Sequence, residues 1–224
     1  MKKMFAKLMA AAMVVSGLCM GTANAVDYVP FSDVSPDSWY YGAVAMAYDT
    51  GYMSGYPDGT FHPNATITRA ECAAILNRMK DYDAQIFGIY TYQDVPSTAW
   101  YADAVNSVGE VMGGVDVLTS NNDILNPDLA MFYPEAACTR IDFCQGIPTT
   151  IDIANTGSYD GTIHHFTDNS LMNAYEVETI SALYNAGIVS GNPDGSFSPN
   201  STISRAEVAQ IISNFVQWNM NQQS

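Results

Sequence analysis

The sequence predicts a repeat protein whose unit is a pair of helices joined by a loop. The main observation is that residues 187–207 repeat residues 51–71 at a constant offset of 136 positions, without a gap. Self-similarity at a fixed spacing is the signature of a repeat architecture. Each copy ends in a helix-starting motif followed by apolar residues at helical spacing, which indicates a helical unit.

The first 25 residues are interpreted as a secretory signal peptide. Three lysines precede an apolar run at 8–20 that is too short to span a bilayer, and an Ala-x-Ala cleavage motif ends at Ala25. We expect cleavage after Ala25 and export of the chain. No later segment is apolar and long enough to predict a membrane helix.

The mature chain would be strongly acidic. It would keep all 23 acidic residues and five of the eight basic ones, for a net charge of −18. This charge disfavours nucleic acid as a partner, and a solvated surface accounts for most of it. The basic residues that remain are Arg69, Arg78, Lys80, Arg140 and Arg205.

Three cysteines follow the signal peptide, and an odd number excludes a complete disulfide framework. Cys138 and Cys144 could pair in an oxidising envelope, whereas Cys72 lies on an apolar helix stripe and is interpreted as a small core residue. The histidines lack cysteine partners at ligand spacing, so the sequence predicts no metal site and no cofactor.

The first repeat is expected to span residues 29–82. Asp37 or Ser38 should cap a helix that starts near Trp39, and Gly51 should end it. The Pro-Asp-Gly at 57–59, and its copy at 193–195, are interpreted as turns because they lack the run of oxygen ligands of a calcium loop.

A second helix should begin at a capping box formed by Thr68 and Glu71, and the third repeat, at 163–218, repeats this with Ser204 and Glu207. The capping box accounts for both glutamates, so neither indicates acid–base catalysis. Apolar stripes at i, i+3, i+4 and i+7 follow. They are Cys72, Ile75, Leu76 and Met79 in the first repeat, and Val208, Ile211, Ile212 and Phe215 in the third.

The second repeat, at 90–145, is degenerate. Its opening matches the first repeat at an offset of 61, which pairs Trp100 with Trp39. Its second half matches at an offset of 64, which aligns residues 132–135 with the Thr-Arg-Ala-Glu of repeat one. In this alignment Tyr133 replaces the arginine, and Pro134 falls in the first turn of the helix, where proline is well tolerated. This alignment predicts that the helix survives without its arginine. Connectors are expected at 83–90 and, as an irregular loop, at 145–162.

These motifs resemble the S-layer homology domain. The resemblance rests on the opening Phe-x-Asp, an aromatic residue six or seven positions later, the Gly-x-x-x-Gly-x-Pro-Asp-Gly-x-Phe-x-Pro segment, and the Thr/Ser-Arg-Ala-Glu element. It covers almost all of the mature chain and is weakest in the second half of repeat two. It implies an all-α module in which three repeats pack with pseudo-threefold symmetry around a shared helical core.

The resemblance also implies a non-catalytic protein, secreted to the cell wall or surface layer, that binds cell-wall glycan in grooves between repeats. The ligand is typically a pyruvylated secondary cell-wall polymer or, in some bacteria with an outer membrane, modified peptidoglycan. Other surface-layer proteins could be partners. Carried over by matching position, the ligand contacts would be Trp39, Gly55, Arg69, Trp100, Gly191 and Arg205, with Arg69 beside Gly55 and Arg205 beside Gly191.

The two arginines suit an anion without the resemblance. Arg69 and Arg205 are each expected at the first position of a helix, where a cation opposes the helix dipole at a cost of about 0.3–1 kcal/mol. Helix-start amides favour an anion, and a guanidinium binds carboxylate or phosphate with two hydrogen bonds. The alternative is an ion pair with a neighbouring carboxylate. Trp39 and Trp100 could likewise be core residues or platforms for sugar rings.

Two functions of different class remain open from the sequence. One is the wall-binding module, and the other is a structural or adaptor protein that docks a partner protein on the degenerate second repeat. An enzyme has little support, because no nucleophile with a paired base, zinc motif or glycosidase-like carboxylate pair stands out.

Overall fold

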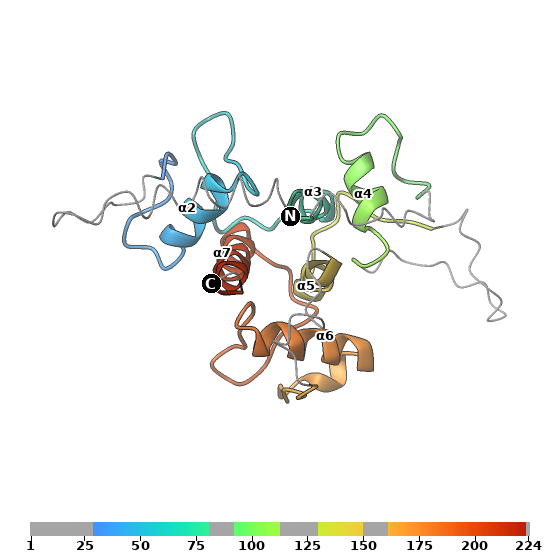
Figure 1. Ribbon diagram of the computed structural model, residues 1–224. Helices are drawn as coiled ribbons and strands as arrows, with labels where there is room; N and C mark the ends of the chain where they lie inside the picture. The colour runs from blue at the N-terminus through green and yellow to red at the C-terminus, as the bar shows by residue number, and fades with distance from the viewer. Residues whose placement is uncertain (1–28, 81–91, 113–129, 150–160, 223–224) are drawn as a thin grey trace. The chain divides into compact units, whose positions relative to one another are not determined.

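The computed structural model describes residues 29–80, 92–112, 130–149 and 161–222 (Figure 1). Within these ranges the regular structure is helical, apart from two isolated β-bridges, which confirms the expected all-α class. The expected signal peptide and the connector at 83–90 lie outside the described residues. None of the helices in these ranges is both long and apolar enough to cross a membrane.

Each repeat contributes two helices to the described part of the chain. The pairs are α2 (Tyr41–Asp49) with α3 (Arg69–Met79), α4 (Ala102–Val108) with α5 (Arg140–Gly146), and α6 (Ala174–Asn185) with α7 (Arg205–Asn221). Short 3₁₀ turns, η2 and η4, occupy Ile147–Thr149 and Asn169–Leu171. The expected connector at 145–162 therefore begins later than predicted, since Gln145 and Gly146 belong to α5.

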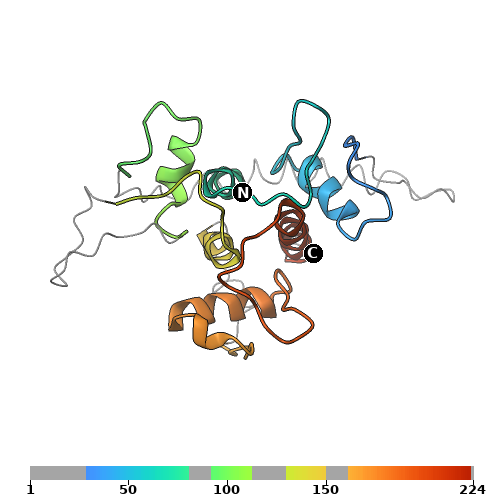
Figure 2. The ribbon, with the colours of Figure 1, turned by 180° about the vertical axis from the view of Figure 1, so that it is seen from behind.

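The chain divides into two compact units. The first comprises the described residues up to Ala65, Ala186–Val189, and those from Ser204 onward, and the second comprises those of Thr66–Asn185 and Ser190–Ile203. In the first unit α2 and α7 pack side by side, as the views from the front and from behind both show (Figures 1 and 2). In the second unit α3 contacts α4 and α5, and α5 contacts α6.

The apolar stripes of α3 and α7 form the core of their respective units. Every residue of the two predicted stripes is at most 4% exposed, so helical spacing identified the buried faces correctly. Cys72 is among them, as expected. Cys138 and Cys144 are also buried, and all three thiols are free, so the pairing of Cys138 with Cys144 does not occur.

The helix α2 starts later than expected and without the expected cap. It begins at Tyr41, and Tyr40 at the N-cap makes no side-chain capping hydrogen bond. The Ser38 hydroxyl donates to the carbonyl of Ser35 in the preceding turn, so the predicted cap at Asp37 or Ser38 is wrong. Gly51 follows the helix with φ of 72°, as expected of a glycine at a helix end.

Complete capping boxes start the second helices of repeats one and three, with Thr68 at α3 and Ser204 at α7. A third capping box, which the sequence alignment missed, starts α5: Thr139 accepts from the amide of Asp142, and the Asp142 carboxylate accepts from the Thr139 amide. The arginine of repeat two is therefore Arg140, the first residue of α5.

This third capping box corrects the alignment of repeat two. Thr139 corresponds to Thr68 at an offset of 71, and the same offset matches the Phe-Tyr-Pro at 132–134 to the Phe-His-Pro at 61–63. Tyr133 does not replace an arginine, and Pro134 lies before the helix. The offset changes from 61 to 71 within the repeat, so the insertion is ten residues rather than three.

The segments that precede the three second helices meet in a closed ring of backbone hydrogen bonds in the second unit. Cys138 donates to Ile67 at 2.9 Å, Ile203 donates to Cys138 at 3.0 Å, and Ile67 donates to Ile203 at 3.2 Å. Each of these residues lies two positions before an arginine. The ring therefore fixes the backbone that leads into Arg69 and Arg140, which lie in the same unit.

Candidate functional site

Each second helix begins with an arginine whose side chain contacts the loop of another repeat. Arg205 contacts the loop of repeat one, Arg69 that of repeat two, and Arg140 that of repeat three. We call each of these contacts an arginine–loop junction. The Arg205 junction lies within the first unit, and the other two lie within the second.

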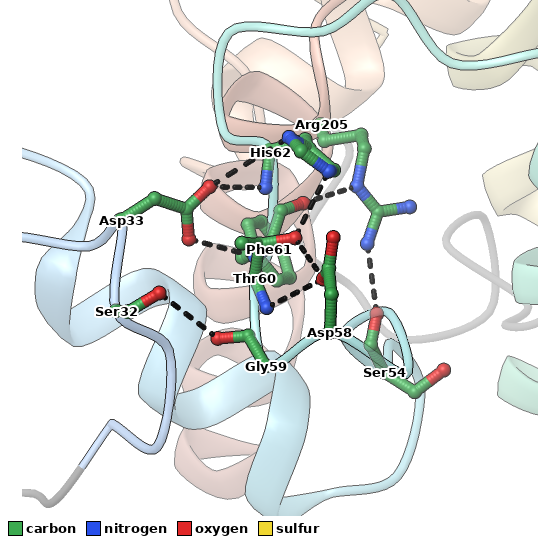
Figure 3. Close-up of polar contacts among 9 residues, drawn as sticks. All are labelled: Ser32, Asp33, Ser54, Asp58, Gly59, Thr60, Phe61, His62 and Arg205. Atoms are coloured by element: carbon green, nitrogen blue, oxygen red, sulfur yellow. Dashed lines mark hydrogen bonds and ion pairs between the residues drawn. The ribbon is translucent and has the colours of Figure 1, made fainter.

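At the Arg205 junction the guanidinium holds the loop by its backbone (Figure 3). Its Nε donates to the carbonyl of Phe61 at 2.7 Å, and its Nη2 donates to that of Ser54 at 2.8 Å. The guanidinium carbon lies 4.6 Å from the Phe61 ring centre and 4.9 Å from that of Tyr56. Arg205 is only 6% exposed. Its first role is therefore to fix the shape of this loop.

The Arg69 junction has the same contacts and adds an ion pair. Nε donates to the carbonyl of Phe132 at 2.8 Å, Nη2 donates to that of Met112 at 3.1 Å, and the guanidinium lies 4.7 Å from the Phe132 ring centre. Nη1 donates to Oδ2 of Asp142 at 2.6 Å. The carboxylate partner considered from the sequence thus exists for Arg69, and it comes from the capping box of α5.

The Arg140 junction is the one that the sequence alignment excluded. Nη2 of Arg140 donates to the carbonyl of Ser190 at 2.7 Å, and the guanidinium lies 4.8 Å from the Phe197 ring centre. The signal that identifies it is Thr139-Arg140-Ile141-Asp142, in which isoleucine and aspartate stand where repeat one has alanine and glutamate. A search for a short capping acid rather than for glutamate alone would have found it.

An aspartate near the start of each repeat clamps the Phe-x-Pro segment of the same repeat. The two carboxylate oxygens of Asp33 accept from the amides of Phe61 and His62, both at 2.7 Å (Figure 3). Asp33 thus acts on residues 28 and 29 positions further along the chain. Asp94 binds Phe132 and Tyr133 in the same way, and Asp168 binds Phe197 and Ser198.

The glycines expected beside the arginines have a packing role. A Cβ on Gly55 would lie 2.1 Å from a ring carbon of Phe31, and one on Gly191 would lie 2.8 Å from a ring carbon of Phe166. The hydrogen bonds of Arg69 lead to repeat two and those of Arg205 lead to repeat one, so each arginine contacts the loop of another repeat. Gly55 follows Ser54 in the loop that Arg205 holds.

The aromatic residues at the matching position of each repeat lie on the surface. Trp39 is 65% exposed, Trp100 is 67% exposed, and Tyr175 is 62% exposed. They are not core residues. Each tryptophan is braced edge-to-face by the tyrosine that follows it, at centroid distances of 5.2 Å and 5.3 Å.

The Pro-Asp-Gly segments are turns closed by their own aspartates. The Asp58 carboxylate accepts from the hydroxyl and amide of Thr60, and these hydrogen bonds lower the pKa of the carboxyl. Asp194 accepts from Ser196 in the same way, with the same effect on its pKa. Among the described residues no group of three or more histidine, cysteine or acidic side chains is arranged to hold a metal ion.

The repeated helix pairs and the arginine–loop junctions define a tandem-repeat module of helical hairpins. The family model of the S-layer homology domain matches residues 30–73 and 165–209, so the chain carries S-layer homology domains at these two segments. The matched segments are repeats one and three, each from its opening residues through the start of its second helix.

Similar proteins occur at bacterial surfaces. Cell surface glycoprotein 1 of Acetivibrio thermocellus is 31% identical over 72% of this chain and 7% of its own length. S-layer protein EA1 of Bacillus anthracis is 29% identical over 94% of this chain and 22% of its own. A cellulosome-anchoring protein of Acetivibrio thermocellus is 28% identical over 72% of this chain and 34% of its own. The chain thus spans between 7% and 34% of the length of these relatives. The matches indicate a secreted protein of the cell surface.

Proposed function

We propose that this chain is a non-catalytic anchor that binds cell-wall glycan, either a pyruvylated secondary cell-wall polymer or modified peptidoglycan. The observation that carries the proposal is the exposure of Trp39, Trp100 and Tyr175 at one matching position of the three repeats. A single exposed aromatic ring needs no explanation, but an exposed ring at the same position of all three repeats points to a shared contact. The flat face of an indole suits the apolar face of a sugar ring.

The two tryptophans are prepared for such a contact. Tyr40 and Tyr101 hold the indoles at interplanar angles of 81° and 82°. A ring that is already braced loses little conformational freedom when a ligand stacks on it, which favours affinity. Three such positions on one chain would also bind a polymer multivalently, so that the loss of one weakens attachment without abolishing it.

The arginine–loop junctions would provide the anion contact. Each places a guanidinium charge at the start of a helix whose first two amides already donate to protein carbonyls, so the attraction would come from the charge rather than from the amides. In a chain with 23 acidic and eight basic residues, these points are where an anionic polymer would be attracted. We propose Arg69 and Arg205 as ligand-positioning residues together with Gly55 and Gly191, and we add Arg140 because it also contacts the loop of another repeat.

The relatives support an anchoring role. One of them is named a cellulosome-anchoring protein and another an S-layer protein. We propose that this chain likewise holds its protein, or partner proteins of the surface layer, on the wall. The alternative of an adaptor that docks a partner on a degenerate repeat two is less favoured, because repeat two has a complete capping box and an arginine that contacts the loop of repeat three.

The experiment that tests this proposal is co-sedimentation of the chain with purified cell walls. We expect Trp39→Ala with Trp100→Ala to weaken binding at least about tenfold, which is the loss of one contact worth about 1.4 kcal/mol. The melting temperature should change little because both indoles are exposed. Leu171→Ala is the matched control, since Leu171 is 59% exposed and lies outside the proposed platform.

Walls from which the secondary polymer has been stripped then identify the ligand. If the polymer is the ligand, stripping abolishes binding of the unaltered chain, and if peptidoglycan is the ligand, binding persists. Binding of the double tryptophan variant at the level of the unaltered chain would contradict the proposal.

A further inference from the structure

The residue between phenylalanine and proline in each Phe-x-Pro segment has an unusual backbone. Among the described residues, the non-glycine residues with positive φ are His62, Tyr133 and Ser198, at 54°, 56° and 60°. All three occupy position x of a Phe-x-Pro segment. A left-handed backbone costs an L-residue on the order of 1–2 kcal/mol.

The other positive-φ positions of the described chain are all glycines. They include Gly51 and Gly59 in repeat one and their counterparts Gly187 and Gly195 in repeat three. The chain therefore places glycine where a loop needs only the left-handed conformation. At position x it keeps a side chain in each repeat, against the backbone preference.

The aspartate clamp explains the conformation at position x but not the residue type. In each clamp two consecutive backbone amides point at the same carboxylate. This arrangement, called a nest, requires one of the two residues to adopt the left-handed backbone conformation. Glycine would supply the clamped amide of His62 equally well, but the His62 ring adds contacts, at 2.9 Å to the Thr60 hydroxyl and 3.9 Å to the Asp33 carboxylate. In repeat three Ser198 makes the matching contact with Ser196, so the side chain at x is held against its own loop in both repeats.

Position x borders the arginine–loop junction and contacts a matching loop residue. The His62 ring lies 4.8 Å from the ring of Tyr56, and Tyr56 lies 4.9 Å from the Arg205 guanidinium. In repeat three the Ser198 hydroxyl accepts from the amide of Asn192 at 2.9 Å. Asn192 corresponds to Tyr56 at the offset of 136, so the same two positions form an aromatic pair in one repeat and a polar pair in the other.

We propose that position x is the ligand-selecting surface of each junction, together with its loop partner in repeats one and three. The aromatic pair of Tyr56 and His62 suits the apolar face of a sugar ring. The amide–hydroxyl pair of Asn192 and Ser198 suits a sugar hydroxyl or acetamide group, which hydrogen-bonds both. This inference rests on the proposed function and deepens it, because it makes the junctions different in the part of the glycan that each recognises.

The first test replaces all three side chains by glycine: His62→Gly, Tyr133→Gly and Ser198→Gly in one chain, assayed with intact purified cell walls. We expect binding to weaken about tenfold or more, a loss of about 1.4 kcal/mol. The melting temperature should stay within a few degrees, because relief of the left-handed strain offsets the higher entropy of the unfolded chain. Unchanged wall binding by the folded variant would overturn the inference.

The second test keeps a side chain at every position and exchanges the pairs. Tyr56→Asn with His62→Ser gives repeat one the pair of repeat three. We expect this variant to be displaced from walls more readily by N-acetylglucosamine oligosaccharides, relative to glucose oligosaccharides, than the unaltered chain is. An unchanged ratio of the two competitors would overturn the inference, also in the case that the triple glycine variant does not fold.

The two proposals fail in different ways. Suppose that the double tryptophan variant loses wall binding while the position-x variants bind normally with unchanged selectivity. The anchoring function would then stand, and position x would have no role in ligand selection. Normal binding in both sets of variants would remove both.

Discussion

The guanidinium of Arg205 lies 4.6 Å from the centre of the Phe61 ring, although the two residues are 144 positions apart in the chain. The first residue of the last helix thus closes onto a loop of the first repeat, within one compact unit. A backbone hydrogen bond joins the same two segments, because the amide of Arg205 donates to the carbonyl of Ala65 at 3.0 Å. Any ligand contact of this loop therefore depends on the C-terminal helix.

Removal of the Arg205 side chain should destabilise the chain strongly. Arg205→Ala leaves the carbonyls of Phe61 and Ser54 without their charged donor and removes the contact with two aromatic rings. We expect a loss of about 2–4 kcal/mol in the free energy of unfolding, measured by urea denaturation. Arg205→Lys should recover only part of it, since a lysine cannot donate in two fixed directions and stack on a ring.

Arg78→Ala is the control for this measurement. Arg78 is exposed on α3, and its replacement should change the free energy of unfolding by no more than about 0.5–1 kcal/mol. If Arg205→Ala were as mild as Arg78→Ala, the junction would not hold the loop.

The aspartate clamp predicts a graded series at Asp33. Asp33→Asn keeps one acceptor oxygen and should lose about 1–1.5 kcal/mol, whereas Asp33→Ala loses both acceptors and should lose about 2–3 kcal/mol. The two bonds concerned are those from the amides of Phe61 and His62. Equal unfolding free energies for the two variants would show that only one of these bonds contributes. Asp37→Ala, at an exposed aspartate of the same segment, should be nearly neutral.

Two glycines of repeat one should respond to alanine in opposite directions. A Cβ at Gly55 would meet a ring carbon of Phe31 at 2.1 Å and the carbonyl oxygen of Thr60 at 2.7 Å, so Gly55→Ala must displace the ring or the loop. We expect a loss of about 1–3 kcal/mol. Gly42 lies in α2 with no neighbour within 4 Å of an added Cβ, and Gly42→Ala should stabilise the helix by up to about 1 kcal/mol. Thermal unfolding should therefore show a lower melting temperature for Gly55→Ala and a higher one for Gly42→Ala than for the unaltered chain.

Local patterns predicted much of this fold because each has a local cause. Helical spacing identified the buried faces of α3 and α7, and the capping boxes located their first residues. The contacts between repeats could not be predicted in this way. Nothing near Arg205 in the sequence shows that its side chain reaches Ser54.

The error in repeat two has a physical origin. The alignment treated Glu as obligatory at the third helical position, whereas the capping box needs only a carboxylate that reaches back to the N-cap amide, and Asp142 does so. The ten-residue insertion before Phe132 then shifted every later residue onto the wrong partner. The exposure of Trp39 and Trp100 could not be predicted either, since a tryptophan beside a helix start is compatible with core and surface.

The buried thiols predict a loss of stability at alkaline pH. Burial raises the pKa of Cys144 to about 12, and burial also raises the pKa of Cys72 well above its ordinary value. In the unfolded chain a thiol loses its proton at about pH 8.5, so between about pH 8.5 and 12 the unfolded state binds fewer protons than the folded state. The free energy of unfolding must therefore fall as pH rises through this range. Lys80, whose pKa is lowered by burial, contributes with the opposite sign.

The Cys144→Ala variant measures how much of this alkaline loss of stability is due to Cys144. Replacing a buried thiol should cost about 1 kcal/mol at neutral pH through lost packing. It should also flatten the alkaline decline, because one thiol that titrates differently in the two states has been removed. Urea unfolding at neutral pH and at about pH 10, where the unfolded thiol is largely ionised, measures the difference. A variant that loses as much stability between the two pH values as the unaltered chain would show that the Cys144 thiol does not stay protonated in the fold.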